Sequence, residues 1–125
     1  MKKTRKKPVK HEELLQKDVV ELLLTYEAQR KLTFTAVTNN VPYTGWKAIK
    51  STEKFKELGM RPGFPDMAIF RFEGLPIFIE LKSKKGQLQD NQEDWRDTLQ
   101  AMGFSWYLIR SVDDVKEVLK KEGVV

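Results

Sequence analysis

The chain has 125 residues, 40% of them hydrophobic and 33% charged, which is typical of one soluble domain with a hydrophobic core. It contains no cysteine and one histidine. Disulfides, thiol nucleophiles and zinc–thiolate sites are therefore excluded, and a histidine-rich metal site has little material. No apolar run approaches the roughly 20 residues of a membrane helix, and no apolar signal segment follows the basic N-terminus, so neither membrane insertion nor secretion is indicated.

The net charge of +5 belongs to the N-terminal tail. Residues 1–10 carry six lysines and arginines and no acid, which leaves a net charge of −1 for the rest of the chain. Such an arm can bind phosphate backbones non-specifically or can be a solvated terminus, and the tail alone does not separate the two. We expect residues 1–11 to form a flexible basic tail and residues 12–125 a single domain.

Residues 12–30 predict a helix, because they contain no glycine or proline and their apolar residues recur at helical spacing. The apolar stripe consists of Leu15, Val19, Leu22, Leu23 and Tyr26. Leu14, Val20 and Leu24 broaden the stripe, so we expect this helix to be well buried. Glu12 falls on the same side, where its carboxylate could contact a metal or a water molecule; the simpler alternative is that it interacts with the helix dipole.

Residues 32–38 alternate in β-branched and aromatic side chains and predict a strand, which Asn39-Asn40 ends. In the basic segment 43–61 that follows, Ser51 can cap a short helix that stops at Gly59. The segment's five bases and two glutamates give it a net charge of +3. Its bases are Lys47, Lys50, Lys54, Lys56 and Arg61. They are either a solvated helix face or a surface for nucleic acid beside the hairpin that follows.

That hairpin consists of two predicted strands, residues 66–72 and 77–82. A three-residue loop from Glu73 to Leu75 would set Phe72 opposite Pro76. This register places five apolar side chains on the core face, namely Met67, Ile69, Ile77, Ile79 and Leu81. The other face then carries Asp66, Ala68, Glu80 and Lys82.

The polar face of the hairpin suggests a metal site. Two carboxylates at close range repel, and one would normally take up a proton, whereas a divalent cation between Asp66 and Glu80 keeps both ionised. Lys82 points the same way as Glu80 and adds a fixed positive charge. Lys84 and Lys85 extend the basic cluster towards Gly86.

Residues 90–102 predict a second long helix, with Gly103 at its C-cap. Its apolar stripe reads Leu88, Gln92, Trp95, Leu99 and Met102. Gln92 therefore faces the sheet, where it could orient a lysine, a water molecule or a phosphate, or could instead cap a strand-end carbonyl. Residues 104–110 predict a further strand, and Ser111 with Asp114 makes a capping box for a last helix that closes near Gly123. The order αβ(α)ββαβα predicts an α/β fold, a mixed sheet with helices packed on it.

On these residues the chain resembles the PD-(D/E)XK nuclease superfamily, and more closely its VRR-NUC (virus-type replication-repair nuclease) branch in the small stand-alone phage and bacterial form. The residues that carry the resemblance are Glu12, Gln16, Asn39-Asn40, Lys56–Gly59, Gly63–Asp66, Ile79–Lys82, Gly86, Gln92 and Gly103. One departure is Gln89, where relatives often have a small capping residue. The early acid is the loosest match, because the pair Glu12-Glu13 allows a one-residue shift.

The resemblance implies a restriction-endonuclease-like fold and Mg²⁺- or Mn²⁺-dependent phosphodiester cleavage. By the same match, Asp66, Glu80 and the carbonyl of Leu81 would bind the metal, and Lys82 would position the attacking water. Glu12 and Gln92 would be further active-site residues. The basic side chains expected to bind nucleic acid are Lys47, Lys50, Lys54, Arg61, Lys84 and Lys85.

Stand-alone relatives point to cleavage of branched DNA, such as four-way junctions, by a homodimer in the cytoplasm of a bacterial or phage-infected cell. Two alternatives stay open. One is a nucleic-acid-binding module that keeps the fold without cleavage, and the other is a small α/β domain with a coincidental polar hairpin.

Overall fold

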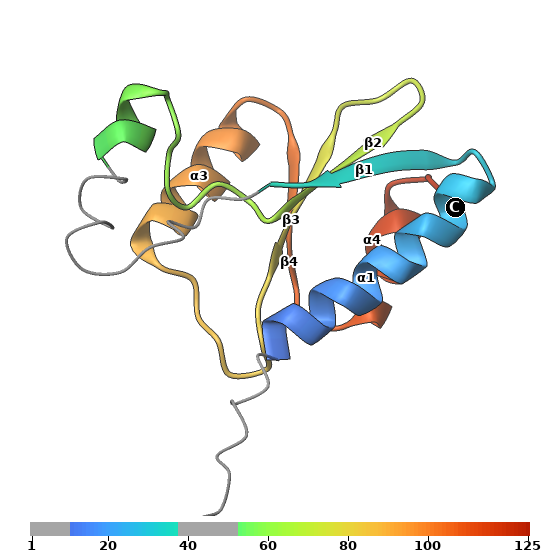
Figure 1. Ribbon diagram of the computed structural model, residues 1–125. Coiled ribbons are helices and arrows are strands. Elements are labelled where there is room, and N and C mark those ends of the chain that lie inside the picture. The colour runs from blue at the N-terminus through green and yellow to red at the C-terminus, as the bar shows by residue number, and fades with distance from the viewer. Residues whose placement is uncertain (1–10, 38–52) are drawn as a thin grey trace, which may run out of the picture.

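The computed structural model describes residues 11–37 and 53–125. Its elements are α1 (His11–Ala28), β1 (Leu32–Ala36), β2 (Met67–Arg71), β3 (Ile77–Leu81), α3 (Asp90–Ala101), β4 (Ser105–Ile109) and α4 (Val112–Lys121), with one further helical turn at residues 53–57. The four strands form a sheet in the order β1-β2-β3-β4 (Figure 1). The first two pairings are antiparallel and β3 pairs with β4 in parallel, which confirms the predicted α/β fold with a mixed sheet.

Helices cover both faces of the sheet. Helices α1 and α4 pack together on one face, and α3 packs on the other against β4 (Figure 1). The predicted core residues of the hairpin are all buried, and they form one cluster with side chains from α1, β1, β4 and α4. The cluster consists of Val19, Leu23, Leu32, Met67, Ile69, Ile77, Ile79, Leu81, Ile109, Val115, Val118 and Leu119. Within the described residues, no helix is long and apolar enough to cross a membrane.

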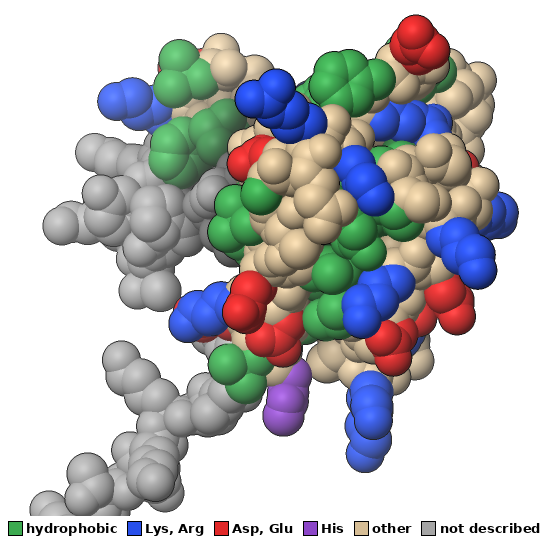
Figure 2. All heavy atoms as spheres, turned by 90° about the vertical axis from the view of Figure 1, so that its right-hand side faces the viewer, with side chains coloured by type: hydrophobic (Ala, Val, Ile, Leu, Met, Phe, Trp, Pro, Cys, Tyr) green, Lys and Arg blue, Asp and Glu red, His purple; other side chains and the backbone are tan. Residues whose placement is uncertain are grey.

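Helix α1 is less buried than its sequence predicts. Val19 and Leu23 are fully buried, but Leu14 and Leu24 are 46% and 51% exposed. The helix lies on the outside of the sheet and buries one narrow stripe, so the leucines at the margins of that stripe meet solvent. Figure 2 shows the corresponding face of the molecule, on which basic and acidic side chains alternate and neither sign dominates.

The register of the hairpin differs from the prediction by two residues. Met67 pairs with Ile79 and Ile69 with Ile77, so no residue of the core face changes sides. The connection is longer than the predicted three-residue loop, because Glu73 takes a positive φ of 53° and the Arg71 side chain donates from Nε to the carbonyl of Leu75 (3.0 Å). Continued by one residue, the observed register places Asp66 across from Glu80; the predicted one would place it across from Lys82.

The ends of α3 and α4 follow the sequence signals, except that only half of the predicted capping box forms, because Oδ2 of Asp114 accepts from the backbone N–H of Arg110 and not from that of Ser111. Gly103 follows the C-cap of α3 with φ of +92°, and Ser111 caps α4 by accepting from the backbone N–H of Asp114. Leu99 is buried as predicted, whereas Met102 is 67% exposed. Met102 lies beyond the last turn of α3, where the sheet no longer covers the helix.

Candidate active site

Asp66 and Glu80 meet where β2 begins and β3 ends. The backbone N–H of Leu81 donates to Oδ2 of Asp66 over 2.7 Å, which holds the aspartate against the end of β3. Glu80 is only 2% exposed, on the face of the sheet that α3 covers. The antiparallel pairing of β2 with β3 therefore brings together two carboxyl groups that are 14 residues apart in the sequence.

Gln92 holds one oxygen of Glu80 and leaves the other free. Nε2 of Gln92 donates to Oε1 of Glu80 (2.8 Å), while Oε1 of Gln92 accepts from the backbone N–H of Gln89 (2.9 Å). The amide is thereby fixed at both ends at the first turn of α3. Oε2 of Glu80 is buried and has no hydrogen-bond partner among the described residues. A buried carboxylate oxygen without a donor is costly, so this atom is available to a ligand.

The two carboxyl groups perturb each other's protonation. Burial, followed by the negative charge of Asp66, raises the pKa of Glu80 to about 8. Burial also raises the pKa of Asp66, although the N–H donated by Leu81 and a hydrogen bond with the Glu80 carboxyl oppose this, and the charge of Glu12 adds to the rise. Both shifts favour one shared proton in the metal-free protein, which is how a carboxylate pair behaves when no cation neutralises it.

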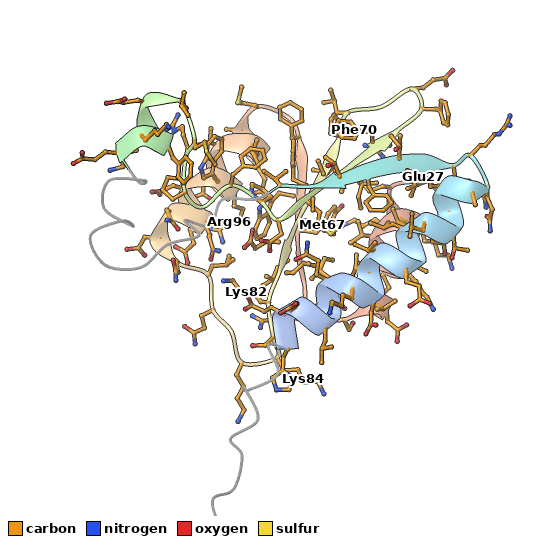
Figure 3. All side chains as sticks on the ribbon, viewed as in Figure 1. Glu27, Met67, Phe70, Lys82, Lys84 and Arg96 are labelled. Carbon is orange, nitrogen blue, oxygen red and sulfur yellow. The ribbon has the colours of Figure 1, made fainter. Side chains whose placement is uncertain are left out.

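Lys82 supplies the positive charge closest to this pair. Its side chain is 8% exposed, and its charge acts to lower the pKa of both Asp66 and Glu80. Among the described residues, no hydrogen bond or ion pair holds its ammonium group. Figure 3 shows Lys82 where β3 leaves the sheet, with Lys84 on the turn beyond it. The lysine is thus poised beside the carboxylates without being neutralised by a direct ion pair.

The N-terminus of α1 forms the opposite wall. Glu12 and Glu13 both line a cleft of about 550 Å³ together with Asp66, Leu81 and Ser83, a size typical of small-molecule sites. The two glutamates differ in their surroundings. Glu12 acts electrostatically on Asp66, whereas Glu13 lies 3.8 Å from the ammonium of Lys17 in an exposed pair.

Asp66 also lines a second, smaller cleft on the side of α3. Gly63, Phe64, Glu80, Gln89, Asn91 and Gln92 line that cleft together with it. Gln16 is the other residue that lines both clefts. It lies one helical turn after Glu12, so the i, i+4 spacing was the signal that could have nominated it.

The loop before Asp66 is anchored to α3. Gly63 has φ of +87°, and a Cβ on it would lie 2.7 Å from the backbone of Asn91, so a side chain has no room here. The indole N–H of Trp95 donates to the carbonyl of Pro62 (3.1 Å), and Phe64 packs edge-on against Trp95 with ring centroids 4.9 Å apart. These contacts fix the direction from which the chain enters Asp66.

The basic residues expected to bind nucleic acid are only partly within the described structure. Lys47 and Lys50 lie outside the described residues. Arg61, Lys84 and Lys85 are exposed, as is Lys54. The Arg61 guanidinium lies 5.3 Å from the centroid of the Trp95 ring, within range of a cation–π contact.

Comparison with known proteins shows the family to which the chain belongs. The VRR-NUC domain matches residues 1–113, which is most of the chain. The chain belongs to the VRR-NUC family, a family of nucleases. Two solved structures named "VRR_NUC domain" and "VRR_NUC domain protein" share the VRR-NUC fold with this chain. The first is 18% identical with a TM-score of 0.60, over 90% of this chain and 97% of the other. The second is 17% identical with a TM-score of 0.63, over 90% and 87%. No curated protein sequence matches the chain.

The donor set of this VRR-NUC chain fits a hard divalent cation. No three acidic or histidine side chains within residues 11–37 and 53–125 form a ready-made metal cage. Mg²⁺ does not require one, because it is usually held by one or two carboxylates and keeps several waters. Asp66 and Glu80 provide that minimum, and the unpartnered Oε2 of Glu80 provides an oxygen with no other use in the fold.

Proposed function

We propose that this VRR-NUC protein is a Mg²⁺- or Mn²⁺-dependent endonuclease that hydrolyses phosphodiester bonds in branched or otherwise structured DNA, such as four-way junctions. The observation that carries the proposal is the pair of half-buried Asp66 and buried Glu80, with one glutamate oxygen unpartnered and an unpaired Lys82 beside it. A structural ion pair would have left neither the free oxygen nor the free ammonium group. The preference for branched DNA and a homodimer rests on the resemblance to stand-alone relatives, since paired nicks in a junction need two sites.

Each residue of the site has a distinct task in this proposal. Asp66, Glu80 and the carbonyl of Leu81 would hold the cation, which when bound supplies Lewis-acid activation of the water and of the phosphodiester. Gln92 keeps the Glu80 carboxylate in one orientation, so that its second oxygen faces the ligand.

Lys82 offers a fixed positive charge where the phosphate gains negative charge on its way to the transition state. Glu12 borders the cleft next to Asp66, where its carboxylate can accept a hydrogen bond from the attacking water. The exposed Arg61, Lys84 and Lys85, with Lys54, would hold the flanking phosphates.

The test is cleavage of labelled junction, flap, single-stranded and duplex DNA with Mg²⁺, with Mn²⁺ and with EDTA. We expect metal-dependent cleavage with a preference for the branched substrates, and its loss in Asp66→Asn and in Lys82→Ala. Asp113→Asn is the matched control, because this carboxylate lies in the first turn of α4 and its side chain is 87% exposed.

Two outcomes would overturn the proposal. Cleavage that persists in EDTA, or at full rate in Lys82→Ala, would remove the mechanism. Binding of junction DNA without cleavage in either metal would favour a non-cleaving nucleic-acid-binding module. Sedimentation of the protein with and without junction DNA decides separately whether it acts as a homodimer.

A further inference from the structure

Lys82 is followed by a tight turn that lies against its own side chain. The N–H of Gly86 donates to the carbonyl of Ser83 over 3.1 Å, which closes the turn at residues 83–86. A methyl group on Gly86 would lie only 3.4 Å from Cδ of Lys82 and 3.1 Å from Oγ of Ser83. The aliphatic stem of Lys82 therefore lies beside the turn, within reach of a single added methyl group, and we expect a displaced turn to displace the ammonium group.

One arginine from the neighbouring strand holds this turn. Nη1 of Arg110 lies 2.5 Å from the carbonyl oxygen of Ser83 and 2.7 Å from that of Gly86, with the carbonyl of Lys84 at 3.2 Å. Arg110 comes directly after β4, and the N–H of Lys82 donates to the carbonyl of Ile109 (3.0 Å). Arg110 and Lys82 thus leave the sheet side by side.

The N-terminus of α4 fixes the backbone of Arg110 in turn. Oδ2 of Asp114 accepts from the backbone N–H of Arg110 (2.9 Å), while the backbone N–H of Asp114 donates to Oγ of Ser111 (3.2 Å). A chain of hydrogen bonds therefore runs from α4 through Arg110 to the turn behind Lys82.

The partners of the Arg110 guanidinium are carbonyls instead of a carboxylate. Within the described part of the chain, no acidic side chain lies within 4.0 Å of it. A half-buried cation usually pairs with an acid, which would cancel its charge. Here three carbonyl dipoles surround its Nη1, so its positive charge adds to that of Lys82, Lys84 and Lys85 next to the carboxylate pair.

We propose that Arg110 is a positioning residue for Lys82: by holding the turn at residues 83–86, it fixes the direction of the lysine ammonium at the carboxylate pair. The proposal rests on the nuclease function proposed above for its kinetic consequence, but the placement of Lys82 can be measured without any cleavage. Arg110 makes no contact of its own with the carboxylates, so its loss should affect turnover more than substrate affinity.

The kinetic arm compares Arg110→Ala, Arg110→Lys and the wild type on junction DNA. We expect kcat to fall about 10- to 100-fold in Arg110→Ala with KM changed less than about threefold, the scale of loss when a reacting group is displaced by about 1 Å. Arg110→Lys keeps the charge, but the lysine side chain is one atom shorter than the path to Nη1 of arginine, so its ammonium group should reach the three carbonyls poorly and recover little of the rate. Added guanidinium ion should partly restore Arg110→Ala and should not restore Lys82→Ala.

Arg71→Lys is the matched control. Arg71 also holds a turn, since Nε donates to the carbonyl of Leu75 (3.0 Å) and Nη1 to that of Glu122 (2.9 Å), but it lies at the far end of the sheet and also pairs with the Glu122 carboxylate (3.3 Å). Its loss should lower stability without changing kcat. If kcat falls as much in Arg71→Lys as in Arg110→Lys, general loosening of the fold explains the result and the proposal is wrong.

The second arm measures Lys82 directly, in metal-free protein without DNA. Acetylation of individual lysines, followed by mass spectrometry, should modify the nearly buried Lys82 several-fold faster in both Arg110 variants and at the wild-type rate in Arg71→Lys. Unchanged labelling of Lys82 in folded Arg110→Lys would overturn the proposal whatever the kinetics. If the wild type cleaves no DNA, the nuclease proposal fails, and the labelling result alone still decides whether Arg110 positions Lys82.

Discussion

Replacing Glu80 with glutamine should stabilise the metal-free protein, and the gain should grow as the pH rises. The Glu80 carboxyl is 2% exposed, and one of its oxygens has no partner within residues 11–37 and 53–125. The amide of Glu80→Gln keeps an oxygen for Nε2 of Gln92 and replaces the other oxygen with an NH₂ group that can donate to Asp66. The substitution therefore removes a buried negative charge and keeps the shape of the site.

The direction and size of this change in stability follow from the pKa of Glu80. Burial and the charge of Asp66 raise it in the folded state to about 8, from an ordinary value of 4.5. The folded protein therefore keeps a proton that the unfolded chain releases, so stability is lost as the pH rises from the unfolded to the folded pKa. Each pKa unit corresponds to about 1.4 kcal/mol, so the full effect is about 5 kcal/mol, shared with the coupled carboxyl of Asp66.

The assay is urea denaturation of the wild type and Glu80→Gln in EDTA at several values between about pH 5 and pH 9. The quantity of interest is the difference in free energy of unfolding between the two proteins, because groups common to both cancel. We expect a difference near zero at the acid end that grows to several kcal/mol by about pH 8. Mn²⁺ should stabilise the wild type at that pH and have little effect on the variant.

Glu117→Gln, at an exposed position on α4, is the control. A difference between the wild type and Glu80→Gln that does not change with pH would refute the reasoning, because it would mean that Glu80 titrates alike in the folded and unfolded chains.

Three further substitutions test the supports of the site. Gln92→Ala should lower the cleavage rate about 10-fold or more, since Glu80 loses the donor that orients it, and unchanged kinetics in a folded variant would return Gln92 to a structural role. Gly63→Ala should destabilise the protein by more than about 3 kcal/mol, because the new Cβ meets both a positive φ and a clash with Asn91. Gly103→Ala is the comparison: it also has a positive φ but nothing within 4 Å, so it should cost about 1–2 kcal/mol. Equal urea midpoints of unfolding for the two variants would contradict the clash. Ser111→Ala should cost about 1 kcal/mol through the lost N-cap, and a thermal midpoint equal to that of the wild type would contradict it.

The hairpin shows what the sequence could and could not predict. Alternation of apolar residues identified the buried face, and that face is confirmed at Met67, Ile69 and Ile79. A shift of two residues preserves every face, so alternation cannot choose between the two registers. The choice depends on the backbone of the loop at Glu73 and on a bond from the Arg71 side chain, neither of which leaves a periodic signal.

The helices show a similar limit. Periodicity placed Val19, Leu23 and Leu99 correctly in the interior, because they lie at the centre of their stripes. It could not tell how wide the covering surface is, so Leu14 and Met102 at the margins were predicted to be buried and are exposed. The contacts of Arg110 join a side chain to backbone carbonyls that are distant in the sequence. Such contacts depend on the tertiary fold, so no pattern in the sequence predicted them.

The observed fold brings the N-termini of three helices to the same end of the sheet. His11 and Glu12 of α1 line the cleft at Asp66, Gln92 in the first turn of α3 bonds to Glu80, and Ser111 before α4 lines a cleft shared with the turn after Lys82.

Helix N-termini carry a partial positive charge, so all three favour negative charge at this point. We expect this arrangement to help a domain whose net charge without residues 1–10 is −1 to attract phosphates beside the half-buried Asp66 and the buried Glu80. We expect the helix ends, Lys82 and Arg110 to supply positive charge to the site together, which predicts that the site depends less on exposed lysines than the overall basic charge of the chain suggests.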